Sequence, residues 1–143
     1  MCADIEELGR HLSDQVIPSS LSDLLSSTAL AHMATIGPKG EPQSSPVWFG
    51  WDGEYLRVSQ TKARQKYRNL RKNPKIALSI VDPENPYRYI EVRGTVVDFV
   101  DDPTKAFIDE MAQKYLNEPK YPWNKPGEDR VVLVIKPEHT TTM

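Results

Sequence analysis

The residues best suited to chemistry lie in one basic segment, residues 62–75. It holds seven lysines and arginines and no aspartate or glutamate, whereas the rest of the chain has 11 basic and 20 acidic residues. The segment follows a polar turn at residues 59–61, and its helical pattern ends at Asn73-Pro74, because proline lacks an N–H and restricts the residue before it. A helix N-terminus leaves backbone N–H donors unpaired, so we expect an anion such as phosphate to bind there, beside Arg64 and Lys66.

Three interpretations of Arg64 and Lys66 follow from the residues alone. In the first, they form the solvated face of a surface helix that packs through Tyr67 and Leu70, at positions i and i+3. In the second, Thr61 caps the helix and both cations bind an anion, which offsets the mutual repulsion of the basic run. In the third, the chain is a non-enzymatic module whose basic helix binds nucleic acid or another polyanion. A net charge of −2 argues against general affinity for nucleic acid.

Side chains that act as catalysts by themselves are scarce in this sequence. The three histidines, His11, His32 and His139, lie far apart and have no partner at i+3 or i+4, which argues against a zinc site. The patterns typical of serine hydrolases, phosphate-binding loops and dinucleotide-binding folds do not occur. An enzyme built from this chain would therefore depend on a bound cofactor, with the protein supplying orientation and electrostatics.

Length and composition indicate one domain in a reducing compartment. The chain of 143 residues is 38% hydrophobic, its mean hydropathy is −0.55, and no apolar run approaches the roughly 20 residues of a membrane span. Cys2 is the only cysteine, so no internal disulfide forms, and the first residues lack the pattern of a signal peptide. We expect a cytoplasmic protein without membrane contacts, in which an N-terminal arm (1–20) precedes the domain (21–137) and a C-terminal tail (138–143) follows it.

Alternation of apolar and polar residues predicts a mainly β, α+β fold. We expect a six-stranded, mostly antiparallel β-barrel with strands at residues 30–36, 42–51, 55–59, 76–81, 89–100 and 131–135. The first three strands would form a meander, and a bulge near residues 94–97 would help to close the barrel. Two or three short helices complete the prediction, at residues 21–25, in the basic segment and from Asp101 onward.

A set of motifs spread over the chain is shared with one known family. The motifs are Ala34-Thr35-Ile36, Gly40, Pro42, Val47-Trp48-Phe49, Asp52-Gly53 and, above all, residues 61–74. Together they resemble the split-barrel flavoproteins related to pyridoxamine 5'-phosphate oxidase, and most of all the branch that binds the deazaflavin coenzyme F420. The resemblance covers roughly residues 24–137, which is nearly the whole domain.

The resemblance implies a homodimeric, F420-dependent oxidoreductase of split β-barrel fold with two cofactor sites at the subunit interface. A hydride would pass from C5 of the reduced deazaflavin to an unsaturated small-molecule substrate, with the proton drawn from solvent. An FMN-binding oxidoreductase of the same fold is the alternative. The resemblance assigns cofactor binding to Gln43, Ser45, Pro46, Val47, Trp48, Ser59, Gln60, Thr61, Arg64, Lys66, Ile80, Val81, Asp82, Trp123, Asn124 and Arg130.

The implied roles divide these residues into groups. The turn at residues 59–61 would line the phosphate-bearing tail of the cofactor, with Arg64 and Lys66 pairing with its phosphate or carboxylates. The second strand would lie along the ring, and residues 80–82 would lie near the same pocket. Three residues would reach in from the partner chain: Trp123, Asn124 and Arg130.

Departures from the family pattern bear on the reaction. The pyridoxal-phosphate-binding residues of the true oxidase and its arginine-rich C-terminus are not recognisable here, which argues against vitamin interconversion. Trp48 would border the ring or lie in the core or dimer interface, whereas Trp51 would belong to the core or interface. The long loop at residues 117–127, which carries three prolines and Trp123, would cover the substrate.

Overall fold

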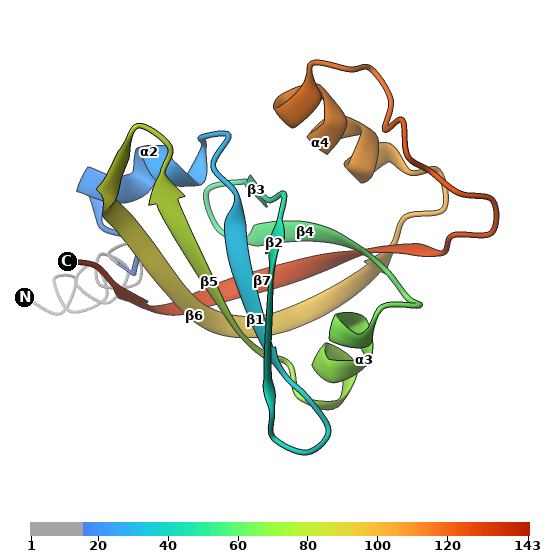
Figure 1. Cartoon of the computed structure of the whole chain (residues 1–143), viewed down its shortest axis with the longest axis horizontal. Helices are drawn as coiled ribbons and strands as arrows, with labels where there is room; N and C mark the ends of the chain where they lie inside the picture. Colours follow the sequence, from blue (N-terminus) through green and yellow to red (C-terminus); the bar gives the residue numbers. More distant parts are fainter. Residues whose placement is uncertain (1–15) are drawn as a thin grey trace, which may run out of the picture.

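One curled sheet of seven antiparallel strands makes up most of the structure (Figure 1). The structure is a computed structural model and describes residues 16–143. The strands are β1 (Ala31–Ile36), β2 (Pro42–Val47), β3 (Gly50–Trp51), β4 (Leu56–Thr61), β5 (Lys75–Asp82), β6 (Asn85–Asp101) and β7 (Arg130–Thr141). Their order across the sheet is β2-β1-β5-β6-β7-β4-β3. The expected N-terminal arm falls largely on residues outside those described.

The two edge strands of the sheet, β2 and β3, follow each other directly in the sequence. Only Trp48 and Phe49 separate them, and the side chain of Phe49 is completely buried. The prediction of one strand over residues 42–51 within a meander is therefore wrong, because the chain crosses here from one edge of the sheet to the other. The alternating pattern continues through this crossing, so periodicity alone does not reveal it. The crossing accounts for seven strands instead of six and keeps the sheet curled as an open barrel.

Alternate side chains of the strands fill the inside of the barrel. Leu56 and Val58 of β4 and Leu78 and Ile80 of β5 are completely buried, while the residues between them are more exposed, as the period of two requires. β5 lies between β1 and β6, so the prediction of a central position for this strand is confirmed. Trp51 packs against the same core from β3.

The long strand β6 bends at Gly94, where the sequence predicts a bulge. Its pairing with β7 shifts register at Gly94 and again after Val96. A Cβ atom at residue 94 would lie 2.1 Å from the carbonyl oxygen of Lys136, so only glycine permits this close approach. β7 runs beyond its predicted end at residue 135, because backbone pairing with β6 continues to Thr141 without any apolar pattern.

Four helical segments flank the sheet: η1 (Ser19–Leu21), α2 (Ser22–Leu25), α3 (Gln65–Lys72) and α4 (Ala106–Leu116). The last two begin later than predicted. The carboxylate of Asp102 accepts hydrogen bonds from the N–H groups of Ala106 and Phe107, so it caps α4 from outside instead of opening it. Within residues 16–143, none of the helices has the length and apolar character needed to cross a membrane.

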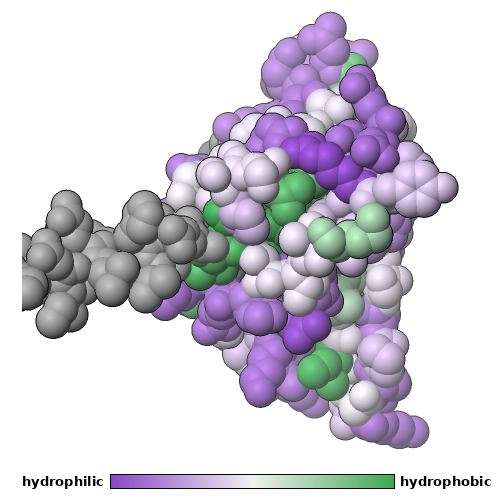
Figure 2. All heavy atoms as spheres, turned by 90° about the vertical axis from the view of Figure 1, so that its left-hand side faces the viewer, coloured by the Kyte–Doolittle hydropathy of each residue, from purple (hydrophilic) through white to green (hydrophobic). Residues whose placement is uncertain are grey.

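Arg88 holds α2 against the turn between β5 and β6. Its guanidinium donates hydrogen bonds to Asp23 at 2.6 Å and Asp82 at 3.0 Å, and to the carbonyl oxygen of Ser20 at 2.6 Å. The face that carries this helix and turn is largely polar, with apolar side chains visible in a central group and in a few separate spots (Figure 2). The polar network therefore joins elements whose apolar residues point mainly into the barrel.

Candidate functional site

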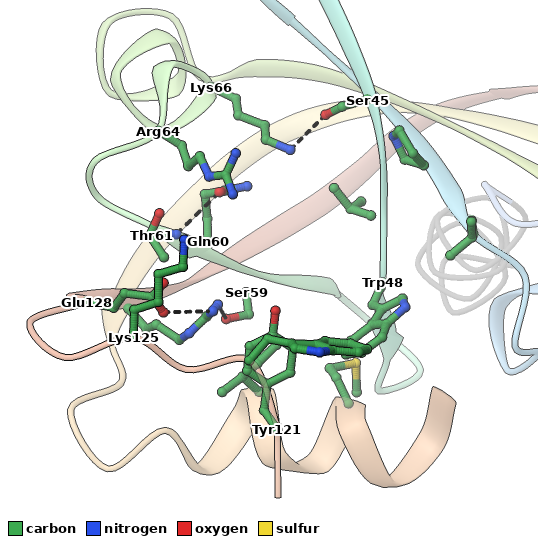
Figure 3. A pocket seen from close by; sticks show the side chains of 17 residues that line it. Ser45, Trp48, Ser59, Gln60, Thr61, Arg64, Lys66, Tyr121, Lys125 and Glu128 are labelled. Carbon is green, nitrogen blue, oxygen red and sulfur yellow. Dashed lines mark hydrogen bonds and ion pairs between the residues drawn. The ribbon is translucent and has the colours of Figure 1, made fainter. Parts of the chain in front are cut away.

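A cavity of about 700 Å³ lies between β2, β4, the start of α3, α4 and the loop that leads into β7 (Figure 3). Eleven of the sixteen residues predicted to bind a cofactor line it: Ser45, Pro46, Val47, Trp48, Ser59, Gln60, Thr61, Arg64, Lys66, Trp123 and Arg130. They come from three strands, one helix and three connecting segments. The sheet brings them together because β2 and β4 lie near its two edges and its curl places these edges opposite each other.

One wall of the cavity carries the cations predicted to bind an anion. The ammonium group of Lys66 donates a hydrogen bond to Ser45 Oγ at 2.7 Å, across the gap from α3 to β2. Burial, and then the positive charge of Arg64, lower the pKa of Lys66 below its usual range. Within residues 16–143 neither cation forms an ion pair with a carboxylate, so an anionic ligand in the cavity would stabilise both.

The backbone between β4 and α3 differs from the prediction. Thr61 is the last residue of β4 and pairs with Arg130, and α3 begins four positions later, at Gln65. Arg64 occupies the N-cap position in an extended conformation, and no side chain caps the helix. The prediction that Thr61 caps α3 is therefore wrong, because pairing with β7 keeps this residue in the sheet.

Arg130 lines the cavity and is 8% exposed. Its guanidinium donates hydrogen bonds to Ser59 Oγ at 3.3 Å and to Glu128 Oε2 at 3.2 Å. The remaining nitrogen, Nε, is buried and has no hydrogen-bond partner among the described residues. The resemblance implies that Trp123, Asn124 and Arg130 reach in from the partner chain, which stays a prediction; Arg130 and Trp123 line the cavity of their own chain.

Aromatic side chains form the opposite wall. Trp48 stacks on Tyr115 of α4, with ring centroids 5.2 Å apart and planes 6° apart. The hydroxyl of Tyr115 donates to the carbonyl oxygen of Ala29 at 2.8 Å and accepts from the N–H of Phe49 at 3.2 Å. Burial raises the pKa of Tyr115 to about 12. The tyrosine thereby fixes the crossing between β2 and β3 and holds the indole of Trp48 at the cavity.

The loop before β7 contributes residues that the sequence did not single out. Tyr121, Lys125 and Glu128 line the cavity together with the predicted Trp123. The length and aromatic content of this loop predicted a functional role, but no spacing rule identifies which of its side chains turn inward. One signal in the sequence could have indicated that the loop lies at the cavity. The loop ends just before Arg130, and Arg130 pairs with Thr61, the last residue of β4.

Five of the predicted residues lie outside the cavity. Gln43 accepts a hydrogen bond from Asn69 at 3.1 Å, and Asn124 donates to the carbonyl oxygen of Tyr121 at 3.2 Å. Ile80 is buried in the core, Val81 is exposed, and Asp82 binds Arg88. A cofactor role for these five stays a prediction: Gln43, Ile80, Val81, Asp82 and Asn124.

Metal ligation has no support in the part of the chain that the structure describes. Within residues 16–143, no group of three or more His, Cys, Asp or Glu side chains is arranged to hold a metal ion. Lys62, the first cation of the basic segment, is engaged in ion pairs with Asp101 at 2.7 Å and Asp129 at 3.6 Å. It therefore fastens the loop to the end of β6, and the cavity depends on the other cations.

A curled antiparallel sheet with a ligand-sized cavity between its edges defines the split-barrel class. The chain belongs to the pyridoxamine 5'-phosphate oxidase family, whose model matches residues 17–143. A solved F420 reductase is 43% identical, covers 89% of this chain and 100% of its own, and superposes with a TM-score of 0.83. The family resemblance and the split-barrel fold expected from the sequence are thus confirmed.

More distant solved structures share the fold. A conserved hypothetical protein from Mycobacterium tuberculosis is 22% identical over 86% of this chain and 81% of its own, with a TM-score of 0.66. General stress protein 26 from Bacillus anthracis is 19% identical over 91% of this chain and 92% of its own, with a TM-score of 0.62.

Proposed function

We propose that this protein is a cytoplasmic oxidoreductase that uses the deazaflavin coenzyme F420 and reduces an unsaturated organic substrate. When bound, the reduced coenzyme supplies the hydride. The observation that carries the proposal is the division of the cavity into a cationic wall and an aromatic wall, which matches a planar ring with an anionic tail. The 43% identity to an F420 reductase, over that whole protein, favours F420.

The cationic wall suits the anionic tail of such a cofactor. Arg64 and Lys66 face the cavity from the start of α3. Burial and the charge of Arg64 lower the pKa of Lys66, and a bound anion would raise this pKa again. Arg130 adds a buried Nε that lacks a hydrogen-bond acceptor among the described residues. Leaving a buried donor unpaired costs about 1–3 kcal/mol, so an acceptor on the ligand would recover this free energy.

The edge strand β2 suits the planar ring. Within residues 16–143, β2 pairs with β1 alone, so the backbone groups along its other side have no partner in the sheet. Ser45, Pro46 and Val47 line the cavity along this edge, and Trp48 continues it with an aromatic face. Ile108 and Met111 of α4 add apolar side chains to the lining of the cavity. Backbone carbonyl and N–H groups of β2 would hydrogen-bond the ring edge while these side chains exclude water.

A homodimer is part of the proposal. Val97 and Val100 of β6 are 50% and 44% exposed, and with Val132 and Val134 of β7 they line an outward-facing depression on the sheet. Exposed apolar side chains gathered on one face favour burial against a second copy of the chain. Light scattering of the purified protein would give twice the monomer mass of 16.3 kDa if this is correct.

The first test is a fluorescence titration of the purified protein with oxidised and reduced F420 and, in parallel, with FMN. Micromolar or tighter binding of F420 with weaker binding of FMN supports the proposal. Preference for FMN would favour the alternative oxidoreductase. Binding of neither would refute both and return attention to polyanion binding by α3, measured as a loss of affinity with rising salt.

A further inference from the structure

The side chain of Tyr121 is fixed from several sides at the mouth of the cavity. Its backbone N–H donates to Asp109 Oδ1 at 2.9 Å, which ties the loop to α4. Its ring meets the rings of Trp48 and Trp123 edge-on, with centroids 5.8 and 5.6 Å apart, and the guanidinium carbon of Arg130 lies 4.9 Å from its centroid. These contacts hold the ring in one orientation before any ligand binds.

The hydroxyl of Tyr121 points into the open space of the cavity (Figure 3). Within residues 16–143 it forms no hydrogen bond, in contrast to the hydroxyl of Tyr115, which is held by Ala29 and Phe49. Two serine hydroxyls of the same cavity act as acceptors, because Ser45 accepts from Lys66 and Ser59 accepts from Arg130. Tyr121 therefore presents a free and oriented O–H donor to a ligand.

The charged groups around Tyr121 come from three elements. Arg130 of β7 lies over the ring, Glu128 of the loop binds Arg130, and Asp109 of α4 accepts the backbone N–H of Tyr121. Lys125 lines the same cavity. The charge that contacts the ring face is therefore the guanidinium of Arg130, which Glu128 in turn holds in place.

We propose, on the basis of the function proposed above, that Tyr121 is a catalytic residue that binds and protonates the carbonyl oxygen of a conjugated substrate. As a hydride with its two electrons arrives at the β-carbon of a C=C–C=O group, a new double bond forms between the α-carbon and the carbonyl carbon. The C=O electron pair moves onto oxygen, which takes the Tyr121 proton to give an enol. The phenolate regains a proton from water, and the released enol becomes the saturated ketone. The substrate thus gains one hydride and one proton.

The binding half of the test needs no cofactor. Trans-chalcone, a conjugated ketone, and trans-stilbene, a hydrocarbon of similar shape, are titrated against the protein and followed by quenching of tryptophan fluorescence. Tyr121→Phe keeps every ring contact and removes only the hydroxyl. We expect it to weaken chalcone binding by about threefold to tenfold, the value of one hydrogen bond, and to leave stilbene binding unchanged. Tyr89→Phe, which removes a hydroxyl outside the cavity, should affect neither ligand.

The second half measures single-turnover reduction of chalcone by protein loaded with reduced F420. Tyr121→Phe should lower this rate by about 100-fold while the affinity for F420 stays constant. Failure of the wild type to bind F420 refutes the proposed function, whereas the chalcone titration still tests the hydrogen bond. An equal rate in the variant, equal losses for chalcone and stilbene, or no chalcone binding to the wild type overturns the role of Tyr121.

Discussion

Removal of the two cations at the start of α3 tests the anion site most directly. Arg64→Ala combined with Lys66→Ala deletes the cationic wall while leaving Tyr67 and Leu70, the packing face of the helix, in place. A charge-assisted hydrogen bond contributes about 1.5–3 kcal/mol. The full value applies to Lys66, which is half-buried, but the contribution of Arg64 is smaller because its exposed side chain is screened by solvent. The pair should therefore contribute about 2–4 kcal/mol to cofactor binding, a loss of about 30- to 1,000-fold in affinity.

The same double variant should not unfold the protein. Folding lowers the pKa of Lys66, so the charged ammonium is less favourable in the folded state than in the unfolded chain. Replacing Lys66 by alanine removes the unfavourable burial of the ammonium charge, and it also removes one hydrogen bond to Ser45. The melting temperature should consequently change little, whereas the affinity for F420 falls.

The assay is the fluorescence titration with F420, run beside a control of equal charge change. Arg71→Ala with Lys72→Ala removes two cations from the last turn of α3, where both side chains are exposed and outside the cavity. This control should lose less than about threefold in affinity, as expected for distant screened charges. Equal losses in the two double variants would show general electrostatic attraction, and an unchanged affinity after loss of Arg64 and Lys66 would refute the site.

Three further changes test other parts of the structure. Trp123→Ala removes a 58%-exposed side chain that contacts Trp48 and Tyr121; it should lower substrate turnover by about two- to tenfold with little effect on melting, and a large melting shift would instead indicate a subunit contact. Tyr115→Phe tests pH dependence: since folding raises the pKa of this phenol from 10.0 to about 12, its contribution to stability is present below pH 10 and is lost as the pH rises toward 12. Melting curves should therefore show the wild type losing its advantage over the variant in that window, and a constant difference would contradict the assignment. Gly94→Ala places a Cβ against the carbonyl oxygen of Lys136, so the free energy of unfolding should fall by about 2–4 kcal/mol in urea titrations; an unchanged midpoint would show that the β6 bend adjusts freely.

Local patterns predicted the strands but not every connection between them. Alternation placed β1, β4 and β5 within a few residues, because each has one face in the core. It failed at Trp48 and Phe49, where apolar residues keep the same period through a change of sheet edge. It also missed the end of β7, whose last residues are polar and pair with β6 through the backbone and through side-chain hydrogen bonds such as that from Thr141 to Glu91. Strand pairing of this kind depends on the partner strand and leaves no mark on side-chain type.

In the candidate site, too, the residues marked by local sequence features were predictable, and those placed by long-range contacts were not. Arg64 and Lys66 were predictable because the segregation of basic residues is a local feature, although the helix begins later than the pattern indicates. Tyr121 and Glu128 were not, because their inward orientation depends on distant contacts such as the hydrogen bond from Tyr121 to Asp109, 12 residues apart. The other end of the loop is fixed by the N–H of Lys62, which donates to the carbonyl oxygen of Asp129 at 3.0 Å. These two hydrogen bonds hold the loop at the cavity. From the sequence, the loop could be recognised only as long and rich in aromatic residues.

The free edge of β2 bears on the proposal that a small ligand, and not another strand, binds at the open side of the barrel. An unpaired edge normally attracts a further strand, since its N–H and C=O groups seek partners. Pro42 and Pro46 each lack an N–H, so they interrupt any continuous ladder along this side without weakening the pairing between β2 and β1. Trp48 and Lys66 both line the cavity beside β2, and Lys66 donates a hydrogen bond to Ser45 of this strand. What stays accessible is a short set of backbone groups between an aromatic and a cationic wall, which a planar anionic ligand can satisfy.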